Sequence, residues 1–418
     1  MSICHPAPLS NTQGDSPCSS PGWIDRTARA LALKTLSHIR HGQIVIQDPL
    51  GTFTFGEPST DQMGCTLQVH SLSLYRTLIR GGSLGAAEAY LEGQWSCDNL
   101  TALVRILCRN MSQLDSMEGG LARIAGWFSR AGHWISRNTR EGSRKNIAAH
   151  YDLSNSLFKL FLDPTMMYSS AVFEDESQSL ESASIAKLDR ICQSLSLRPT
   201  DHLVEIGTGW GGMALHAAKN YGCHVTTTTI SKEQHAMASQ RIQEAGLQDR
   251  VTLLMTDYRD LAGQYDKLVS VEMIEAVGDE YLPTYFSTCD RLLKPGGKML
   301  IQAITMPDQR YATYLKSVDF IQKYIFPGGC LPSVGAMQAA VSKGTGLRLT
   351  GLFDFAESYA ITLRNWRERF FQRITEVREL GFDDRFIRMW EYYLCYCEGA
   401  FRERAVGVSH LVWEKVKY

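Results

Sequence analysis

The sequence predicts an α/β protein in which one wound, mostly parallel sheet follows a smaller, mainly helical N-terminal domain. The chain has 418 residues, more than the roughly 100–200 residues of an ordinary domain, so we expect two domains. From residue 200 onward, β-like runs alternate with helical patterns, as is typical of parallel α/β sheets. Apolar residues make up 44% of the chain and charged residues 21%, which provides enough apolar material for such a core.

The part of the chain before the sheet divides into a tail, a small domain and a linker. Residues 1–22 combine four prolines with small polar residues, a composition that predicts a disordered tail. Residues 23–120 show helical periods together with β-like runs at 43–48 and 53–55, so we expect a small mixed domain there. The main domain is expected to occupy residues 146–418.

The linker, residues 121–145, is predicted to form a basic amphipathic helix. Apolar residues recur in it at three- and four-residue steps, including Trp127 and Trp134. Basic residues flank this stripe, with only Glu141 opposing them: Arg123, Arg130, Arg137, Arg140, Arg144 and Lys145. A helix of this kind suits an anionic membrane surface. A linker helix packed on the following domain is the alternative.

Five β-like runs define the main sheet, and two later runs extend it. The first five occupy residues 202–207, 224–231, 251–257, 267–273 and 298–305. Later runs at 347–355 and 410–416 are predicted to complete the sheet at its edge. Amphipathic patterns at 366–380 and 384–401 predict two helices between these late strands.

Charge and cysteine usage exclude several classes of function. Basic residues number 43 and acidic residues 44, so nothing suggests a nucleic-acid partner. The 11 cysteines contain no CxxC pair, which predicts neither a metal site nor a disulfide framework and favours a reducing, cytoplasmic location. No apolar run reaches the roughly 18–20 residues that cross a bilayer, so we expect peripheral contact with the inner face of the membrane at most.

A glycine-rich turn follows the first predicted strand of the sheet. It runs from Glu205 through Gly207 and Gly209, and glycines permit both a tight turn and close approach of a ligand to the backbone. The turn lacks the ending of a phosphate-binding loop and the spacing of a dinucleotide fingerprint, which leaves S-adenosylmethionine as the common ligand. Asp257 and Tyr258, after the third strand, supply a carboxyl group for the adenine amine and a ring for its face.

At this point the sequence resembles the cyclopropane-fatty-acyl-phospholipid synthase family of S-adenosylmethionine-dependent methyltransferases. Motifs on both sides of the linker carry the resemblance, and they occur in the order found in the family. They are GSLGAAEAYLEGQW at 82–95, HYDLSNSLFKLFLDPTMMYSSAVF at 150–173, VEIGTGWGG, TTISKEQ at 228–234, DYRD at 257–260, VEMIEAVG at 271–278 and SYAITLRNWRERF at 358–370. The resemblance implies a Rossmann-like, class I methyltransferase sheet and a lipid-handling N-terminal domain.

The resemblance also assigns cofactor-binding residues. Tyr168 and Ser169 are expected to hold the methionine part of S-adenosylmethionine above Gly207 and Gly209. Two polar side chains, Thr229 and Gln234, are expected to bond the ribose hydroxyls, and Tyr258 is expected to cover the adenine.

The implied reaction is methyl transfer to the cis double bond of an unsaturated phospholipid acyl chain, followed by ring closure to a cyclopropane. The family is understood to use a bound bicarbonate as the base that removes the final proton. Carried onto this chain, its ligands are Glu275, the backbone amide of Ile304 and Tyr359. Ser170 stands where the family has cysteine, and Gln302 stands where it has histidine, so an imidazole that could relay protons is missing at this position.

These departures leave a second product open, because the cation formed by methyl transfer can also lose a proton from a neighbouring chain carbon. The product is then a methyl-branched alkene without a ring, as in furan-fatty-acid synthesis. A small-molecule N-methyltransferase is a more distant alternative, and a lipid-binding protein without activity is the alternative from a different class. The resemblance further suggests a homodimer.

Overall fold

The computed structural model describes residues 22–58, 61, 63–112 and 154–417. The predicted linker helix at 121–145 lies outside these residues, as does the predicted tail apart from Gly22. The domain boundaries at residues 120 and 145 lie outside them too and stay predictions. No helix in the described ranges is long and apolar enough to cross a membrane.

A seven-stranded sheet forms the larger part of the molecule, in the order β10-β11-β9-β8-β5-β6-β7. Its strands are β5 (His202–Ile206), β6 (His224–Thr228), β7 (Val251–Leu254), β8 (Tyr265–Val271), β9 (Leu293–Thr305), β10 (Leu347–Asp354) and β11 (Gly407–Lys415). The strands from β5 to β9 pair in parallel, whereas β11 pairs antiparallel with both β9 and β10. The predicted wound sheet is therefore confirmed, including its two late strands, with β11 inserted between β9 and β10.

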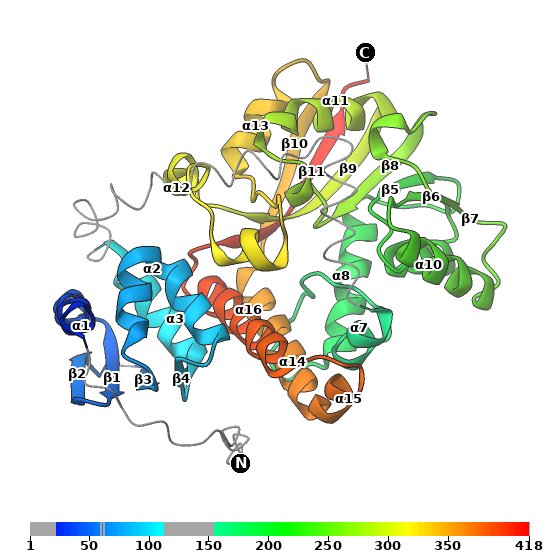
Figure 1. Cartoon of the computed structure of the whole chain (residues 1–418). Coiled ribbons are helices and arrows are strands. Elements are labelled where there is room, and N and C mark those ends of the chain that lie inside the picture. The colour runs from blue at the N-terminus through cyan, green and yellow to red at the C-terminus, as the bar shows by residue number, and fades with distance from the viewer. Residues whose placement is uncertain (1–21, 59–60, 62, 113–153, 418) are drawn as a thin grey trace.

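Helices cover both faces of this sheet (Figure 1). One face is covered by α8 (Leu180–Ser194), α9 (Gly212–Tyr221) and α10 (Lys232–Glu244), and the other by α11 (Leu282–Leu292) and α13 (Val334–Val341). Neighbouring strand residues alternate between the two cores, so that Leu203 packs with α8 and α9 and Val204 packs with α11. This three-layer arrangement places the carboxyl ends of the parallel strands along one edge, where such sheets bind ligands.

The large domain contains further helices among the described residues. They are α7 (Asn155–Phe161), α12 (Asp308–Tyr314), α14 (Ala356–Gln372), α15 (Ile374–Glu379) and α16 (Asp384–Arg402). Short helical turns occur at η1 (Tyr258–Asp260), η2 (Ile274–Ala276), η3 (Asp279–Tyr281) and η4 (Ile321–Ile325). Helix α16 confirms the pattern predicted at 384–401. The pattern at 366–380 is helical as well, but it is divided between the end of α14, which begins earlier at Ala356, and the short helix α15.

In the described residues before 113, the N-terminal lobe contains three helices and a second sheet. Its elements are α1 (Trp23–Leu36), β1 (Gly42–Asp48), β2 (Gly51–Glu57), β3 (Gly64–Val69), α2 (Ser73–Leu91), β4 (Trp95–Cys97) and α3 (Leu100–Arg109). The two β-like runs predicted from the sequence form β1 and β2, which pair antiparallel, and the sheet has the order β2-β1-β3-β4.

The N-terminal lobe packs against α16, which lies between α3 and α14 (Figure 1). Gly399 permits the close approach, because a Cβ atom added there would lie 2.7 Å from a methyl group of Val104. Glu403 accepts hydrogen bonds from Arg105 at 2.6 Å and from Arg109 at 2.7 Å. Buried residues of the lobe and of α14 and α16 form one continuous hydrophobic core.

Candidate active site

Most of the predicted site residues gather at the carboxyl ends of β5, β6, β8 and β9 and on the segment before α8, whereas Asp257 and Tyr258 follow β7 and Tyr359 lies on α14. The glycine-rich turn leaves β5, Thr229 follows β6, and Glu275 follows β8, while Gln302 and Ile304 lie near the end of β9. Because these strands are parallel, their ends meet at one edge of the sheet, and residues far apart in the sequence become neighbours there.

The turn after β5 has the backbone geometry of a ligand cradle. Gly207, Gly209 and Gly211 adopt φ angles of +99°, +54° and +86°, a region that favours glycine. The amides of Gly207 and Thr208 donate to the carbonyl of Thr228 at 3.1 and 3.0 Å, which ties the turn to β6. A Cβ atom at Gly209 would meet no atom within 4 Å, so the backbone there is open to a bound molecule.

Two buried ionisable residues, Glu205 and Lys187, lie close to this turn. Glu205 was selected from the sequence, whereas Lys187 was not. Glu205 accepts a hydrogen bond from the Thr227 hydroxyl at 2.6 Å, and burial raises its pKa to about 8. Lys187 of α8 is fully buried and donates to the hydroxyl of Ser169 at 2.7 Å. Burial lowers the pKa of Lys187 to about 8, although the charges of Glu272, Asp163 and Glu205 favour its protonated form.

The two residues expected to bind ribose lie together at the end of β6. The hydroxyl of Thr229 donates to Oε1 of Gln234 at 2.9 Å, and the amide of Ser231 donates to the same hydroxyl at 3.1 Å. Ser231 also caps α10 by accepting from the amide of Gln234 at 3.3 Å. The start of α10 thus fixes both polar side chains beside the turn.

Asp257 and Tyr258 begin η1 beyond the end of β7. Both carboxylate oxygens of Asp257 accept from Arg259, at 2.8 Å from Nε and 2.6 Å from a terminal nitrogen. Arg259 was not predicted, and it orients the carboxylate on which the adenine interaction was expected. The Tyr258 ring packs edge-on against Tyr285, with 5.4 Å between centroids.

Three of the predicted catalytic residues converge on Glu272, a residue that the sequence prediction did not select. The amide of Ser170 and Nε2 of Gln302 donate to Oε1 of Glu272 at 2.9 and 2.7 Å. The hydroxyl of Tyr359 donates to Oε2 at 2.7 Å. Burial raises the pKa of Glu272 although these hydrogen bonds and the charge of Lys187 oppose the change. We call the four residues Ser170, Glu272, Gln302 and Tyr359 the carboxylate cluster.

The other two predicted ligands, Glu275 and Ile304, bond each other. The amide of Ile304 donates to Oε1 of Glu275 at 2.6 Å, whereas Oε2 of Glu275 is buried with no hydrogen-bond partner. Burial and, to a lesser extent, the negative charge of Glu272 together raise the pKa of Glu275 to about 8. The backbone amide expected to hold an anion is therefore already engaged.

An imidazole does occur beside Gln302, on the neighbouring strand. His410 of β11 pairs with Gln302 of β9 in the sheet register, and its Nε2 lies 2.9 Å from Oε1 of Gln302. Because Nε2 of Gln302 donates to Glu272 and to the carbonyl of Ser170, Oε1 must face the imidazole, which donates to it as the Nε2–H tautomer. Burial lowers the pKa of His410 to about 3, so the ring is neutral and fixes the orientation of the amide.

Aromatic side chains surround this part of the site. The hydroxyl groups of Tyr168 and Tyr393 lie 3.0 Å apart. The Tyr168 ring centroid lies 5.1 Å from that of Trp366 and 5.0 Å from that of Phe158. The Phe158 centroid lies 4.8 Å from that of Trp210, so the rings extend to the glycine-rich turn. The Tyr359 ring centroid lies 6.2 Å from that of Trp366. We call these six rings the aromatic cluster: Phe158, Tyr168, Trp210, Tyr359, Trp366 and Tyr393.

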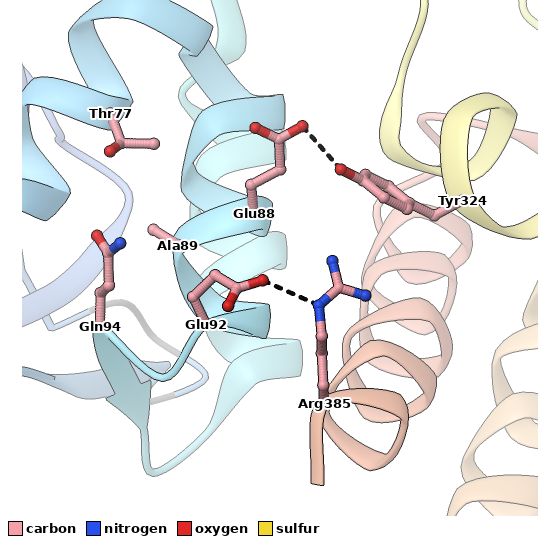
Figure 2. Close-up of a pocket in the computed structure, with 7 residues that line it drawn as sticks. All are labelled: Thr77, Glu88, Ala89, Glu92, Gln94, Tyr324 and Arg385. Carbon is pink, nitrogen blue, oxygen red and sulfur yellow. Dashed lines mark hydrogen bonds and ion pairs between the residues drawn. The ribbon is translucent and has the colours of Figure 1, made fainter. Parts of the chain in front are cut away.

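A pocket of about 380 Å³ lies between α2, η4 and the start of α16 (Figure 2). Its carboxylates are paired, because Glu88 accepts from Tyr324 and Glu92 from Arg385, each at 2.9 Å. It is lined by Thr77, Glu88, Ala89, Glu92, Gln94, Tyr324 and Arg385 and contains none of the predicted site residues.

The order of the large sheet and the glycine turn at its edge define an S-adenosylmethionine-dependent methyltransferase. The chain belongs to the mycolic acid cyclopropane synthetase family, whose model matches residues 138–411. The resemblance seen in the sequence is therefore confirmed, and the protein is a C-methyltransferase with S-adenosylmethionine as its cofactor.

Two curated relatives match most of the chain. The tuberculostearic acid methyltransferase UfaA1 of Mycobacterium tuberculosis is 42% identical over 354 residues, which cover 80% of each chain. The cyclopropane-fatty-acyl-phospholipid synthase of Escherichia coli is 38% identical over 356 residues, which cover 84% of this chain and 87% of that protein. Among solved structures, mycolic acid cyclopropane synthase CmaA1 complexed with SAH and CTAB is 31% identical, with a TM-score of 0.59, and covers 65% of this chain and 98% of its own.

The residues present fit S-adenosylmethionine. The backbone at Gly209 is open, and two polar side chains, Thr229 and Gln234, lie beside it. Tyr168 belongs to the aromatic cluster, and Ser169, which accepts a hydrogen bond from Lys187, directly precedes Ser170 of the carboxylate cluster. The roles predicted for these individual residues stay predictions.

Proposed function

We propose that this enzyme methylates the cis double bond of unsaturated phospholipid acyl chains and forms cyclopropane fatty acids. Lipid methylation is the activity that the names of its relatives share, since they describe a fatty-acyl-phospholipid synthase and a tuberculostearic acid methyltransferase. The finer assignment names phospholipid as the substrate and a cyclopropane as the product. It is supported by the similarity of most of the chain to the E. coli synthase.

The aromatic cluster is the observation that carries this proposal. An alkene is a weak nucleophile, so it must be held close to the methyl donor in surroundings that exclude water. S-adenosylmethionine supplies an electrophilic methyl group on sulfonium. We expect the rings of Tyr168, Trp366 and Phe158, which pack against one another, to provide apolar surroundings for an acyl chain and to stabilise positive charge that develops on it. The aromatic cluster reaches from Trp210 of the glycine-rich turn to Tyr359 of the carboxylate cluster, which supports a single site for both steps of the proposed reaction.

A methyl-branched alkene is the second candidate product. Ser170 and Gln302 replace the cysteine and histidine expected from the family, and the first of the two relatives above is named for methyl transfer and not for ring formation. Both products begin with the same methyl transfer and differ in the carbon that loses the proton.

Lipid analysis of a host that lacks its own synthase tests the proposal. The host is transformed with the gene, and the fatty-acid methyl esters are examined by mass spectrometry with a labelled methyl donor. Ring and branched alkene share one mass, but only the alkene takes up hydrogen under mild conditions. A cyclopropane supports the proposed product, an alkene supports the second candidate, and lipids without label contradict both.

We further propose that the protein binds anionic membranes peripherally, on the cytoplasmic side, through residues 121–145. Each basic residue close to such a surface contributes about 1 kcal/mol, so Arg130→Glu with Arg137→Glu should weaken sedimentation with anionic vesicles strongly. Arg198→Glu with Lys219→Glu, at exposed positions of the large domain, makes the same charge change and should have little effect. Equal binding by both double variants would favour the packed-linker alternative. We also propose that the protein is a homodimer, as the family resemblance suggests, and sedimentation equilibrium of the purified protein tests this.

A further inference from the structure

The carboxylate cluster has the chemistry of an anion site that the protein fills with its own side chain. Ser170, Gln302 and Tyr359 are three of the five positions where the family resemblance places bicarbonate ligands. All three donate to Glu272, at 2.9, 2.7 and 2.7 Å. The amide of Ile304, a fourth position, donates to Glu275 at 2.6 Å. The donors that would bind a free anion are thus engaged by carboxylates of the chain.

Bicarbonate does not fit this arrangement. A second anion would lie against the negative charge of Glu272 and would find the amides of Ser170 and Ile304 already bonded. A glutamate carboxylate, in contrast, presents the same planar O–C–O group as bicarbonate, attached to the chain. The position is therefore occupied by a group of matching shape and charge.

The backbone of Glu272 supports a functional role for this side chain. Its φ angle is +49°, a region that glycine adopts readily and that long side chains seldom adopt. Such strain persists where the surrounding structure holds it, and it concentrates at functional sites. Glu272 directly follows β8, and its amide donates to the carbonyl of Gln302 at 2.8 Å, so the strained residue is anchored beside its own partner.

We propose that the Glu272 carboxylate replaces bicarbonate and accepts the proton released after methyl transfer. This inference rests on the proposed function. The carbon–sulfur bond breaks with its electron pair left on sulfur, and the alkene π pair forms the new carbon–carbon bond. A C–H bond on the new methyl group or on a chain carbon then breaks. Its electron pair closes the ring or forms a double bond, and the proton goes to Glu272.

Oxygen Oε2 of Glu272 is the acceptor that the hydrogen bonds favour. Oε1 accepts from both Ser170 and Gln302, whereas Oε2 accepts from Tyr359. A lone pair on Oε2 is therefore left for the proton. Tyr359 also belongs to the aromatic cluster, which places this oxygen beside the proposed acyl-chain site.

Glu272→Gly and Glu272→Gln provide the test. Glycine suits the positive φ angle and removes the side chain, which leaves the donors of Ser170, Gln302 and Tyr359 free for an anion. Glutamine keeps the size of the side chain but cannot act as the base. Glu379→Gln, at an exposed position on α15, is the matched control. Calorimetry with S-adenosylmethionine confirms that each variant is folded and binds the cofactor.

The first readout is binding of ¹³C-labelled bicarbonate, followed by NMR, which needs no substrate. We expect binding by Glu272→Gly and none by the wild type or the Glu379→Gln control. The second readout is methylation of unsaturated phospholipid vesicles in buffer depleted of carbon dioxide. We expect unchanged wild-type activity, loss of about 100-fold or more in Glu272→Gln, and recovery of Glu272→Gly when bicarbonate is added.

Either readout can overturn the inference. Binding of bicarbonate by the wild type, or a wild-type rate that depends on added bicarbonate, contradicts replacement by Glu272. Retention of the wild-type rate by Glu272→Gln contradicts the role of base. If the wild type binds S-adenosylmethionine but methylates no lipid, the proposed function fails together with the proton-transfer step, whereas the binding readout still decides what occupies the anion position.

Discussion

The cofactor turn and the carboxylate cluster lie at the same sheet edge, but they are built in different ways. The turn comes from one continuous segment, Glu205 to Gly212, whose glycines adopt the backbone angles that their residue type favours. The carboxylate cluster combines residues from the segment before α8, from the ends of β8 and β9, and from α14. A local segment can be predicted from its residues. The hydrogen bonds within a cluster of distant residues, in contrast, depend on how several elements pack together in the folded chain.

Breaking the turn should have the largest effect. Valine at Gly207 is strained by a φ of +99° and places its Cβ 3.3 Å from Met273. We expect Gly207→Val to lose S-adenosylmethionine binding by at least about 100-fold and to destabilise the protein by about 1–3 kcal/mol. Gly209→Val strains a φ of +54° in the same way but places its Cβ against no protein atom within 4 Å, so it removes only the contact with Met273, and Gly81→Val is the exposed control. Unchanged affinity in calorimetry would contradict the predicted cradle.

The second-largest effect is expected when a hydrogen-bond donor to Glu272 is removed from the carboxylate cluster. Gln302→Leu removes one donor from Glu272 and leaves the Nε2–H of His410 without its acceptor. We expect kcat to fall about 10- to 100-fold while cofactor affinity stays within about twofold, because Gln302 positions the base and does not touch the turn. Gln248→Leu, at an exposed position, should change neither value. Equal loss of affinity and kcat would indicate general unfolding of the sheet edge.

A smaller effect is expected when the family residues are restored. Ser170→Cys with Gln302→His should raise the proportion of cyclopropane, by about 2- to 5-fold, because an imidazole can hold and relay a proton. While Glu272 is present, we expect this double variant to stay insensitive to bicarbonate. Adding Glu272→Gly should create the sensitivity. Gas chromatography of the lipid methyl esters with and without bicarbonate compares the variants.

The smallest effect concerns pH and stability. The folded-state pKa of Glu275 is raised to about 8, so between pH 4.5 and 8 the folded state holds a proton that the unfolded chain has lost. This group therefore lowers the free energy of unfolding as pH rises through that range. Glu275→Gln removes this contribution but keeps an acceptor for the amide of Ile304. The Tm of the variant minus the Tm of the wild type should therefore increase by roughly 2 °C when the pH is raised from 5 to 8. For the control Glu379→Gln, the Tm difference from the wild type should not change with pH, as thermal unfolding at several pH values would show.

The sequence predicted the sheet well because each strand carries its own local pattern. The runs that became β5 to β9 are apolar and β-branched, and glycine or proline punctuates several of the connections between them. The position of β11 between β9 and β10 could not be derived, because strand order depends on packing between distant segments. His410 was missed for that reason, since only the pairing of β11 with β9 brings it to Gln302.

Within the site, the sequence indicated which segments meet but not which atoms bond. Ser170, Gln302 and Tyr359 were expected around an anion, and they surround the carboxyl group of Glu272. Glu272 was passed over in favour of Glu275, three residues later in the same motif. A signal was present, because an acidic residue that directly follows a buried parallel strand stands where such sheets bind ligands. Its positive φ angle, however, has no signature in the sequence.

The close contact between α3 and α16 limits how far this protein can be treated as separable modules. The Tyr359 ring stacks on Phe401 of α16 at 4.4 Å between centroids, and Gly399, two residues earlier, lies against Val104 of α3. Leu103 and Ile106 of the lobe share their core with Trp390 and Phe401. Removal of the lobe would expose apolar surface on the helix that supports Tyr359. A truncated form of this enzyme should therefore retain α1 to α3 together with α16. In a chimaera, these helices should all come from the same parent protein.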